Sequence, residues 1–507
     1  MQMNSNALKS NDTTLFWGCF TALVATAFGF VARTQIISDW AIEFNLTETQ
    51  KGEIFGVGFW PFAISIILFS LVIDKIGYRN AMLFGFVCHV VSAFMTIFAT
   101  GYDMLYMATF IMALGNGTVE AYINPVVATL YSKDKTKWLN ILHAGWPAGI
   151  VLGGLLVISI NTMSWEFKVA LIFLPVIAYV FMLFGRKFPI NERVAAGVSY
   201  KDMLKEVGII GALIISTLIS AEIGTRLGLP TWAIVTTIVV VTGIYGFYAR
   251  SLGNGIFLLL MVIMIPLATT ELGTDSWITS LMEPEFAKIG QDSLWLLIYT
   301  SSIMAVLRLF AGPIVHKLTP LGLLAISAIV AAVGLLFLSK ATGIMILAAA
   351  TLYGLGKTFF WPTTLGVVAE RFPKGGALTL NGISGVGMLG IGIVGAVFLG
   401  NIQDKSIDKG VAAYDKEHGT SLHTTYVTQE KSGIFGSYKA LGLEELANAS
   451  EEDANTIQTI QDGAKKQALS TVAIFPVIML ICYIGLILYF RSKGGYKPVE
   501  LEVKEQT

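Results

Sequence analysis

Two similar stretches of sequence decide the fold of this chain. One reads Gly117-Thr-Val-Glu-Ala-Tyr-Ile-Asn-Pro125, and the other reads Gly354-Leu-Gly-Lys-Thr-Phe-Phe-Trp-Pro362. Both lie inside long apolar runs, their Gly and Pro residues align, and each is followed by a basic loop and a Gly-rich apolar run. The repeat places Glu120 opposite Lys357. It predicts two related halves that face a common central site, which is how transporters that work by alternating access are built.

The composition around these stretches is that of a chain embedded in lipid. Of 507 residues, 54% are hydrophobic and 13% are charged, whereas a soluble domain carries about 25% charged residues. A single soluble core stops growing at roughly 250–300 residues, so the surplus apolar surface must face lipid. The formal net charge is zero and no basic domain stands out, so we expect no nucleic acid as a partner.

Fourteen apolar runs are long enough to span a bilayer, since a spanning helix needs about 20 mostly apolar residues. They occur in groups of six, two and six, without the alternation of barrel strands. We therefore expect an all-α polytopic membrane protein with fourteen transmembrane helices. The predicted segments are a cytoplasmic tail (1–14), a six-helix bundle (15–186), a cytoplasmic linker with two extra transmembrane helices (187–254), a second six-helix bundle (255–491) and a cytoplasmic tail (492–507).

The charges of the loops orient these helices. Lys and Arg are concentrated in the loops on the side of the N-terminus, which places both termini in the cytoplasm by the positive-inside rule. The polar segment 401–466, between the last two spans, is then extracytoplasmic. Its acidic part, 441–466, is expected to be helical and to continue into the final span. The first apolar run is too long for a signal-peptide core, so we expect it to remain as the first spanning helix. The compact loops fit a bacterial inner membrane.

The loop after the second span carries a recognisable motif. It reads Ser70-Leu-Val-Ile-Asp-Lys-Ile-Gly-Tyr-Arg79 and resembles the cytoplasmic loop motif of the major facilitator superfamily, with Ser70 in place of the usual leading Gly. The resemblance implies the major facilitator fold, with two six-helix halves plus the inserted pair, and we expect a monomer. It also implies a cytoplasmic gate that opens as the halves rock. The gate residues are Asp74, Lys75, Gly77 and Arg79.

A second resemblance concerns the first of the two repeated stretches. Gly117, Glu120 and Asn124-Pro125 look like the fourth helix of the fucose/galactose/glucose–proton symporters, in which a Glu-x-x-x-Asn-Pro sequence supplies a sugar-contacting, coupling carboxylate. The resemblance gives that role to Glu120. Alignment on the link between the first two helices puts Thr34 where this group has a proton-carrying Asp, with Arg33 beside it. Because this Asp is replaced by Thr34, the coupling ion can be either H⁺ or Na⁺, and an anionic substrate is also compatible with the sequence.

Ionisable residues at bilayer depth need a partner or a water-filled cavity. Glu120 and Lys357 are central and oppositely charged, so a contact between them that the substrate alters would couple binding to protonation. A permanent ion pair between them is the alternative. The candidates for ion coupling are Glu120, Glu271, Asp275 and Lys357, and the other charges expected inside the membrane are Arg33 and Arg308.

Polar and aromatic residues of the same helices are candidates for binding a substrate. Trp side chains can stack on a sugar ring and donate an N–H, and buried amides must find partners. For each aromatic residue, packing is the alternative. The candidate substrate-binding residues are Glu120, Asn124, His143, Trp146, Glu271, Trp277, Lys357, Trp361 and Asn381.

These observations lead us to expect a secondary active transporter. We expect cation-coupled symport of a sugar or a sugar-derived solute, including an acidic one, by alternating access. The alternatives are a proton-coupled exporter of amphipathic drugs, a peptide–proton symporter and a non-transporting membrane sensor on the same fold. The chain lacks a nucleotide-binding loop, a metal-binding cluster and a catalytic triad. We therefore expect neither an enzyme nor a cofactor.

Overall fold

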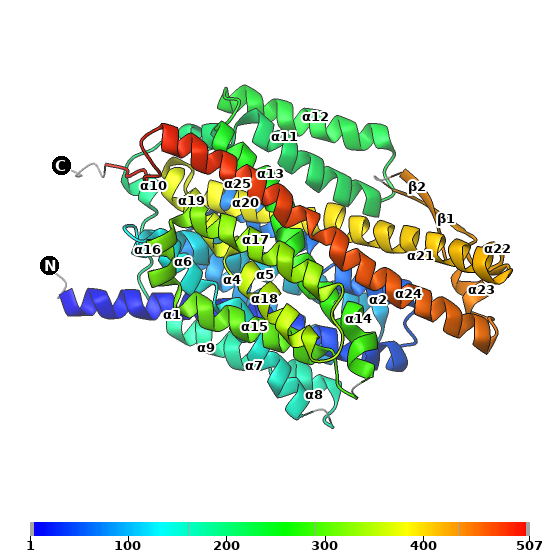
Figure 1. Cartoon of the computed structure of the whole chain (residues 1–507). Coiled ribbons are helices and arrows are strands. Elements are labelled where there is room, and N and C mark those ends of the chain that lie inside the picture. The colour runs from blue at the N-terminus through cyan, green and yellow to red at the C-terminus, as the bar shows by residue number, and fades with distance from the viewer. Residues whose placement is uncertain (1–4, 161, 289, 434–435, 503–507) are drawn as a thin grey trace.

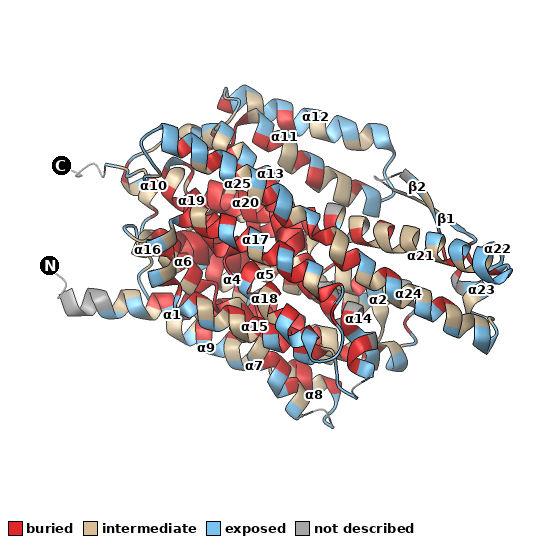
Figure 2. Cartoon of the chain, viewed as in Figure 1, coloured by how far each residue is buried: buried red, intermediate tan, exposed pale blue. Residues whose placement is uncertain are grey.

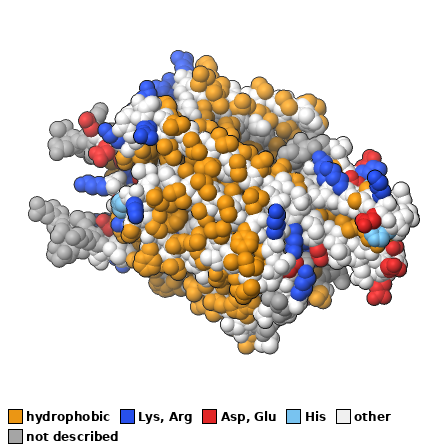
Figure 3. Space-filling model, in the orientation of Figure 1, with side chains coloured by type: hydrophobic (Ala, Val, Ile, Leu, Met, Phe, Trp, Pro, Cys, Tyr) orange, Lys and Arg blue, Asp and Glu red, His pale blue; other side chains and the backbone are white. Residues whose placement is uncertain are grey.

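A computed structural model of the chain describes residues 5–160, 162–288, 290–433 and 436–502. It confirms the all-α fold, with one two-stranded antiparallel sheet among the described residues, formed by β1 (Gln429–Gly433) and β2 (Gly436–Ala440). Buried residues fill the middle of the bundle (Figure 2). On the face shown in Figure 3, hydrophobic side chains cover the middle and charged ones gather toward the two ends, as expected for a protein that crosses a bilayer.

The first half is a bundle in which several long helices are broken. Gly77, with φ +82°, allows the tight turn between two of them. Its helices are α1 (Ser5–Glu43), α2 (Glu48–Gly56), α3 (Trp60–Ile76), α4 (Tyr78–Ile97), α5 (Tyr102–Leu130), α6 (Lys135–Leu142), α7 (Gly145–Ser159), α8 (Trp165–Ala170) and α9 (Phe173–Leu183). The connecting α10 (Glu192–Ala195) leads to the hairpin of α11 (Tyr200–Arg226) and α12 (Thr231–Ala249), which lies along the side of the bundle (Figure 1).

The second half repeats this pattern of broken helices. Its first long helix contains a π-helical turn, η1 (Thr269–Gly273), between α13 (Gly255–Ala268) and α14 (Thr274–Ala287). The others are α15 (Leu294–Leu309), α16 (Ala311–Leu318), α17 (Pro320–Leu338), α18 (Met345–Lys357), α19 (Phe360–Arg371), η2 (Pro373–Gly375), α20 (Gly376–Gly390), η3 (Ile391–Ala396), α21 (Val397–His418), α22 (Leu422–Tyr426), α23 (Leu443–Ala447), α24 (Glu451–Val472) and α25 (Ile474–Ser492).

Fewer helices are long and apolar enough to span a membrane than the sequence predicts. Among the described residues, eleven helices are long and apolar enough to cross a membrane, or twelve if the bent pair α15–α16 is one span. Neither α5 nor the α18–α19 pair is among these, although both were counted in the predicted fourteen. These segments contain the two repeated stretches, whose polar residues lower their hydropathy. Fourteen transmembrane helices therefore stays a prediction.

The first and last described residues lie at one end of the molecule, which we call the terminal end (Figure 1). At the opposite end, α21 and α24 extend beyond the bundle and pack against each other. With α22, α23 and the two strands they form a projection that has a small apolar core of its own, which includes Val411, Tyr426 and Ile457. The helix α24 continues into α25 with only Ala473 between them. The expected continuation into the last long helix therefore holds for 451–466, whereas residues 448–450 interrupt the helix that was expected over 441–466.

Candidate functional site

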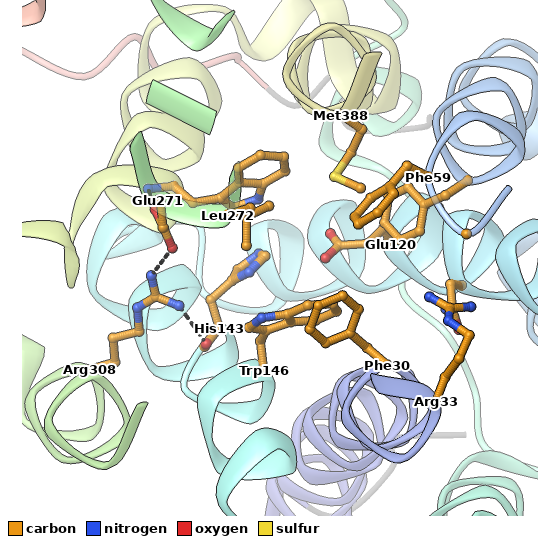
Figure 4. Close-up of a pocket in the computed structure, with 14 residues that line it drawn as sticks. Phe30, Arg33, Phe59, Glu120, His143, Trp146, Glu271, Leu272, Arg308 and Met388 are labelled. Atoms are coloured by element: carbon orange, nitrogen blue, oxygen red, sulfur yellow. Dashed lines mark hydrogen bonds and ion pairs between the residues drawn. The ribbon is translucent and has the colours of Figure 1, made fainter. Parts of the chain in front are cut away.

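A cavity lies between the two halves. Its walls come from α1, α3, α5 and α7 on one side and from η1, α15, α19 and α20 on the other (Figure 4). The structure thus brings together residues that are far apart in the sequence. The lining residues that the sequence analysis singled out are Arg33, Glu120, His143, Trp146, Glu271, Arg308 and Trp361.

Glu120 presents a carboxylate to this cavity. The helix α5 can approach α3 closely because residue 117 is Gly; a Cβ atom there would lie 2.2 Å from the carbonyl oxygen of Phe62. Glu120 is 5% exposed, and its Oε2 accepts a hydrogen bond of 2.7 Å from Asn124 Nδ2. No described Lys, Arg or His forms an ion pair with it. In Figure 4 its carboxylate points into the cavity, with Phe59 on one side and Trp146 on the other.

A chain of polar contacts connects Asn124 to the second half. Asn124 Oδ1 lies 2.9 Å from Nε2 of His143, which is at the break between α6 and α7. The backbone carbonyl of His143 accepts a hydrogen bond of 3.0 Å from Arg308 Nη1, and Arg308 Nη2 lies 2.6 Å from Glu271 Oε1. The Trp361 backbone N–H donates to the other oxygen of Glu271 at 3.0 Å. Arg308 and Glu271 are therefore a buried, fully bonded ion pair.

The prediction that Glu120 contacts Lys357 is wrong. Lys357, at the end of α18, forms a buried ion pair with Asp275 on α14 instead. Neither partner belongs to the cavity wall in the described structure. The repeat places Glu120 and Lys357 on corresponding helices, but it does not determine which way each side chain points. The π-helical turn that contains Glu271 separates the two acids, so Glu271 faces the cavity and Asp275 does not.

The remaining candidate residues have different environments. Asn381 on α20 donates to the carbonyl oxygen of Ala121 at 2.9 Å and so joins the two halves beside the cavity. The Trp146 ring packs 5.8 Å from that of Phe30, and both line the cavity. The side chain of Trp277 lies outside the described residues.

Asn116 is a cavity residue that sequence reasoning missed. It precedes Glu120 by one turn of α5, and its Oδ1 lies 2.9 Å from His89 Nε2. The other ring nitrogen of His89 lies 3.2 Å from the Tyr179 hydroxyl. These contacts orient the Asn116 amide so that its nitrogen is available to a ligand. Asn116 lies four residues before Glu120, which places both side chains on the same face of a helix, and this spacing could have identified it from the sequence.

The predicted gate residues lie at the terminal end. Asp74 forms an ion pair of 2.5 Å with Arg193 on α10, which follows α9. The sequence analysis did not predict Arg193 as a partner of the gate residues. Lys75 lies over the Tyr200 ring and Arg79 over the Phe184 ring. Their interactions thus remain within the first half and the segment that follows it.

Contacts between the two halves at the same end involve other residues. Thr136 on α6 donates two hydrogen bonds to Glu370 on α19. Lys135 donates to the carbonyl oxygen of Ala369 at 3.2 Å, and Asn140 Nδ2 donates to Thr363 Oγ1 at 3.1 Å. All these donors are buried. The central cavity is therefore closed toward the terminal end in this structure.

Comparisons with known proteins agree with this architecture. A family model described as Major Facilitator Superfamily matches residues 15–396. The solved structure of the proton:xylose symporter XylE has a TM-score of 0.62 at 13% identity and covers 97% of this chain and 98% of its own. The E. coli fucose:proton symporter FucP has a TM-score of 0.52 at 16% identity, covering 90% of this chain and 98% of its own.

One relative is also detectable by sequence. It is the "Protein TsgA homolog" of Buchnera aphidicola subsp. Schizaphis graminum (strain Sg), which is 28% identical over 125 residues. The match covers 25% of this chain and 32% of that protein, so the chain spans about a third of the length of this relative.

Proposed function

This chain belongs to the Major Facilitator Superfamily, and we propose that it is a secondary active transporter that imports a sugar or a sugar-derived solute together with a cation. An integral membrane protein of this superfamily is a transporter rather than an enzyme. XylE and FucP, which share the fold, are named as proton symporters of xylose and fucose. We assign this chain a solute of the same class, with H⁺ as the coupling ion.

The observation that carries the proposal is the position of Glu120. Its carboxylate faces the cavity between the halves, and its one hydrogen bond in the described structure comes from a neutral amide, Asn124. A carboxylate without a cation beside it is easily protonated in a low-dielectric site. Glu120 can therefore bind and release a proton as the solute enters and leaves. Glu271 is less suited to this role because both of its oxygens are already bonded, one to Arg308 and the other to the Trp361 backbone N–H.

The cavity walls offer suitable contacts for a hydroxylated ring. Trp146, Phe30 and Phe59 provide aromatic faces, which stack on the apolar face of a sugar. Asn116 and His143 add groups that can bond to hydroxyls. Such a mixture of aromatic faces and a few polar groups is typical of small-molecule sites.

Alternating access then requires the halves to separate at the terminal end. The contacts of Thr136 with Glu370 would break in that step. The proposed gate residues Asp74, Lys75, Gly77 and Arg79, whose described contacts stay within the first half and the segment after it, would form the side of the gate that belongs to the first half. We propose that this end is cytoplasmic, in a bacterial inner membrane, because both termini and the basic loops lie there. We further propose that one monomer is sufficient and that residues 401–466 form an extracytoplasmic projection.

Uptake into vesicles tests the transport proposal. The purified chain is reconstituted into liposomes and offered labelled hexoses, pentoses and their acids under an inward proton or sodium gradient. We expect accumulation of at least one of these solutes under the proton gradient and none in protein-free vesicles. Uptake of dipeptides or extrusion of amphipathic dyes instead would favour a peptide symporter or a drug exporter. No movement of any solute would favour a sensor.

A further inference from the structure

Six Lys and Arg side chains are buried among the described residues, and five of them have acidic partners. Arg308 is bonded to Glu271 and Lys357 to Asp275. Arg33 on α1 is 9% exposed, yet within the described structure it has no ion pair, and its Nε is buried without a hydrogen-bond partner. A guanidinium remains protonated in proteins, and a charge at membrane depth needs a partner or a water-filled cavity. Arg33 thus has a charge that no described residue neutralises.

The surroundings of Arg33 leave space for an anion. Its side chain borders the central cavity (Figure 4) and a second cavity inside the first half. A Cβ atom on Gly58 would lie 2.5 Å from one terminal nitrogen of Arg33, so Gly is required there for the guanidinium to take this position. Phe55 supports it from another side, with its ring centre 5.7 Å from Cζ. The planar guanidinium can donate two parallel hydrogen bonds to a carboxylate.

The charges of the cavity wall determine the charge of an occupant. Arg308 and Glu271 compensate each other, so the balance depends on Arg33 and Glu120. With a proton on Glu120 and a neutral His143, the wall has one net positive charge. One carboxylate neutralises it. A phosphate ester, which has about two negative charges at neutral pH, would leave an excess of negative charge in a low-dielectric site.

We propose that Arg33 is the receptor for the carboxylate of a monoanionic sugar acid, such as a hexuronate, which is transported together with one proton on Glu120. This deepens the proposed function and rests on it. The proton and the carboxylate enter together, so their charges cancel and net transport is electroneutral. Symport of a neutral sugar with one proton would instead move one positive charge per cycle.

The charge balance gives the first test, made with the full-length chain in liposomes. Labelled glucuronate, galacturonate and glucose are compared under an inward proton gradient, with and without an inside-negative potassium diffusion potential. We expect the chain to accumulate a hexuronate in preference to glucose, at a rate that the potential does not change. Accumulation of glucose alone, accelerated by the potential, would overturn the inference and leave sugar symport intact. Accumulation of none of the three would overturn the inference, and the wider panel of hexoses and pentoses would then decide whether sugar symport stands.

Variants of Arg33 give the second test. Arg33→Gln should weaken hexuronate binding by roughly tenfold or more, because a charge-assisted hydrogen bond contributes about 1.5–3 kcal/mol and 1.4 kcal/mol is a factor of ten. Arg33→Lys, which keeps the charge but loses the planar fork, should retain part of the affinity. Arg226→Gln is the control, since Arg226 is bonded to Glu222 on the same helix. Ligand-induced thermal shifts in detergent report binding and folding together. Unchanged hexuronate affinity in folded Arg33→Gln would refute the assignment.

Discussion

Thr136 on α6 and Glu370 on α19 are joined by two hydrogen bonds to one carboxylate oxygen, at 2.5 Å from the Thr136 hydroxyl and 3.2 Å from its backbone N–H. The other oxygen of Glu370 accepts a bond of 2.7 Å from Tyr496, near the C-terminus. One buried acid thus connects the two halves and the C-terminal tail at the terminal end. Any state that opens the cavity at this end has to break the Thr136 contacts.

We expect Glu370→Ala to favour that open state. Hydrogen bonds to a charged group contribute about 1.5–3 kcal/mol each, so their loss should shift the equilibrium by roughly tenfold or more. The measurement is thiol labelling of Asn140→Cys, a buried position at this interface, in a background with the three natural cysteines replaced. Labelling should be faster in Glu370→Ala than in the control Glu417→Gln, on the projection. Equal labelling rates would show that the hydrogen bonds between Thr136 and Glu370 do not hold the halves together.

The ion pair of Lys357 and Asp275 leads to a prediction about stability. Removing one partner of a buried ion pair leaves an uncompensated charge and costs about 3–5 kcal/mol, whereas replacing both is often neutral. Lys357→Met should therefore lower the unfolding free energy by roughly this amount. The double variant Lys357→Met/Asp275→Leu should recover most of it. Denaturant or thermal unfolding in detergent measures both. A double variant no more stable than Lys357→Met would contradict the pairing.

Gly58 gives a test of how Arg33 is positioned. The methyl group of Gly58→Ala would lie 2.5 Å from the Arg33 guanidinium and displace it. We expect weaker hexuronate binding by several-fold and little loss of fold stability. Gly52→Ala is the matched control, because its Cβ would meet no described atom within 4 Å. Titration calorimetry of each variant gives the affinities. Equal affinities in the two variants would show that the position of the guanidinium does not matter.

The projection should have its own dependence on pH. Although partial burial opposes it, hydrogen bonds from Thr420 and from the backbone N–H groups of Leu422 and His423 lower the pKa of Asp415. A lowered pKa in the folded state means that the stabilisation is present above the unfolded pKa, near 3.9, and is lost as the pH falls through the folded value.

Hydrogen exchange measures this effect locally. After correction for intrinsic rates, protection of the Leu422 and His423 amides should decrease at acidic pH, and Asp415→Asn should show reduced protection at neutral pH without this dependence on pH. Glu417→Asn, two residues away and exposed, is the control. Protection that is independent of pH in the natural protein would contradict the assigned role of Asp415.

The sequence predicts the fold and much of the cavity wall because both depend on patterns that repeat. Apolar runs identify the helices, and the repeated stretch places Glu120 on a helix that faces the second half. Charges at bilayer depth point to Arg33, Glu271 and Arg308, since each must have a partner or a cavity. All four residues line the cavity.

Pairing within the site was not predictable from those patterns. Which acid meets Lys357 depends on the π-helical turn at Thr269–Gly273, and such a turn has no clear signature in one sequence. The partnership of Asp74 with Arg193 likewise depends on how the segment after the sixth long helix folds back. The role of His89 in orienting Asn116 involves three helices that only the tertiary structure brings together.

The central claim is that Glu120 carries the coupling proton, and Glu120→Gln tests it most directly. Proteoliposomes with the natural or the variant chain are offered the labelled solute that the natural chain accumulates. Two modes are compared, namely accumulation driven by an inward proton gradient and exchange against unlabelled solute inside. The account predicts that Glu120→Gln retains exchange, because a neutral side chain mimics the protonated acid, but no longer accumulates solute. Accumulation by Glu120→Gln to the level of the natural chain would contradict it.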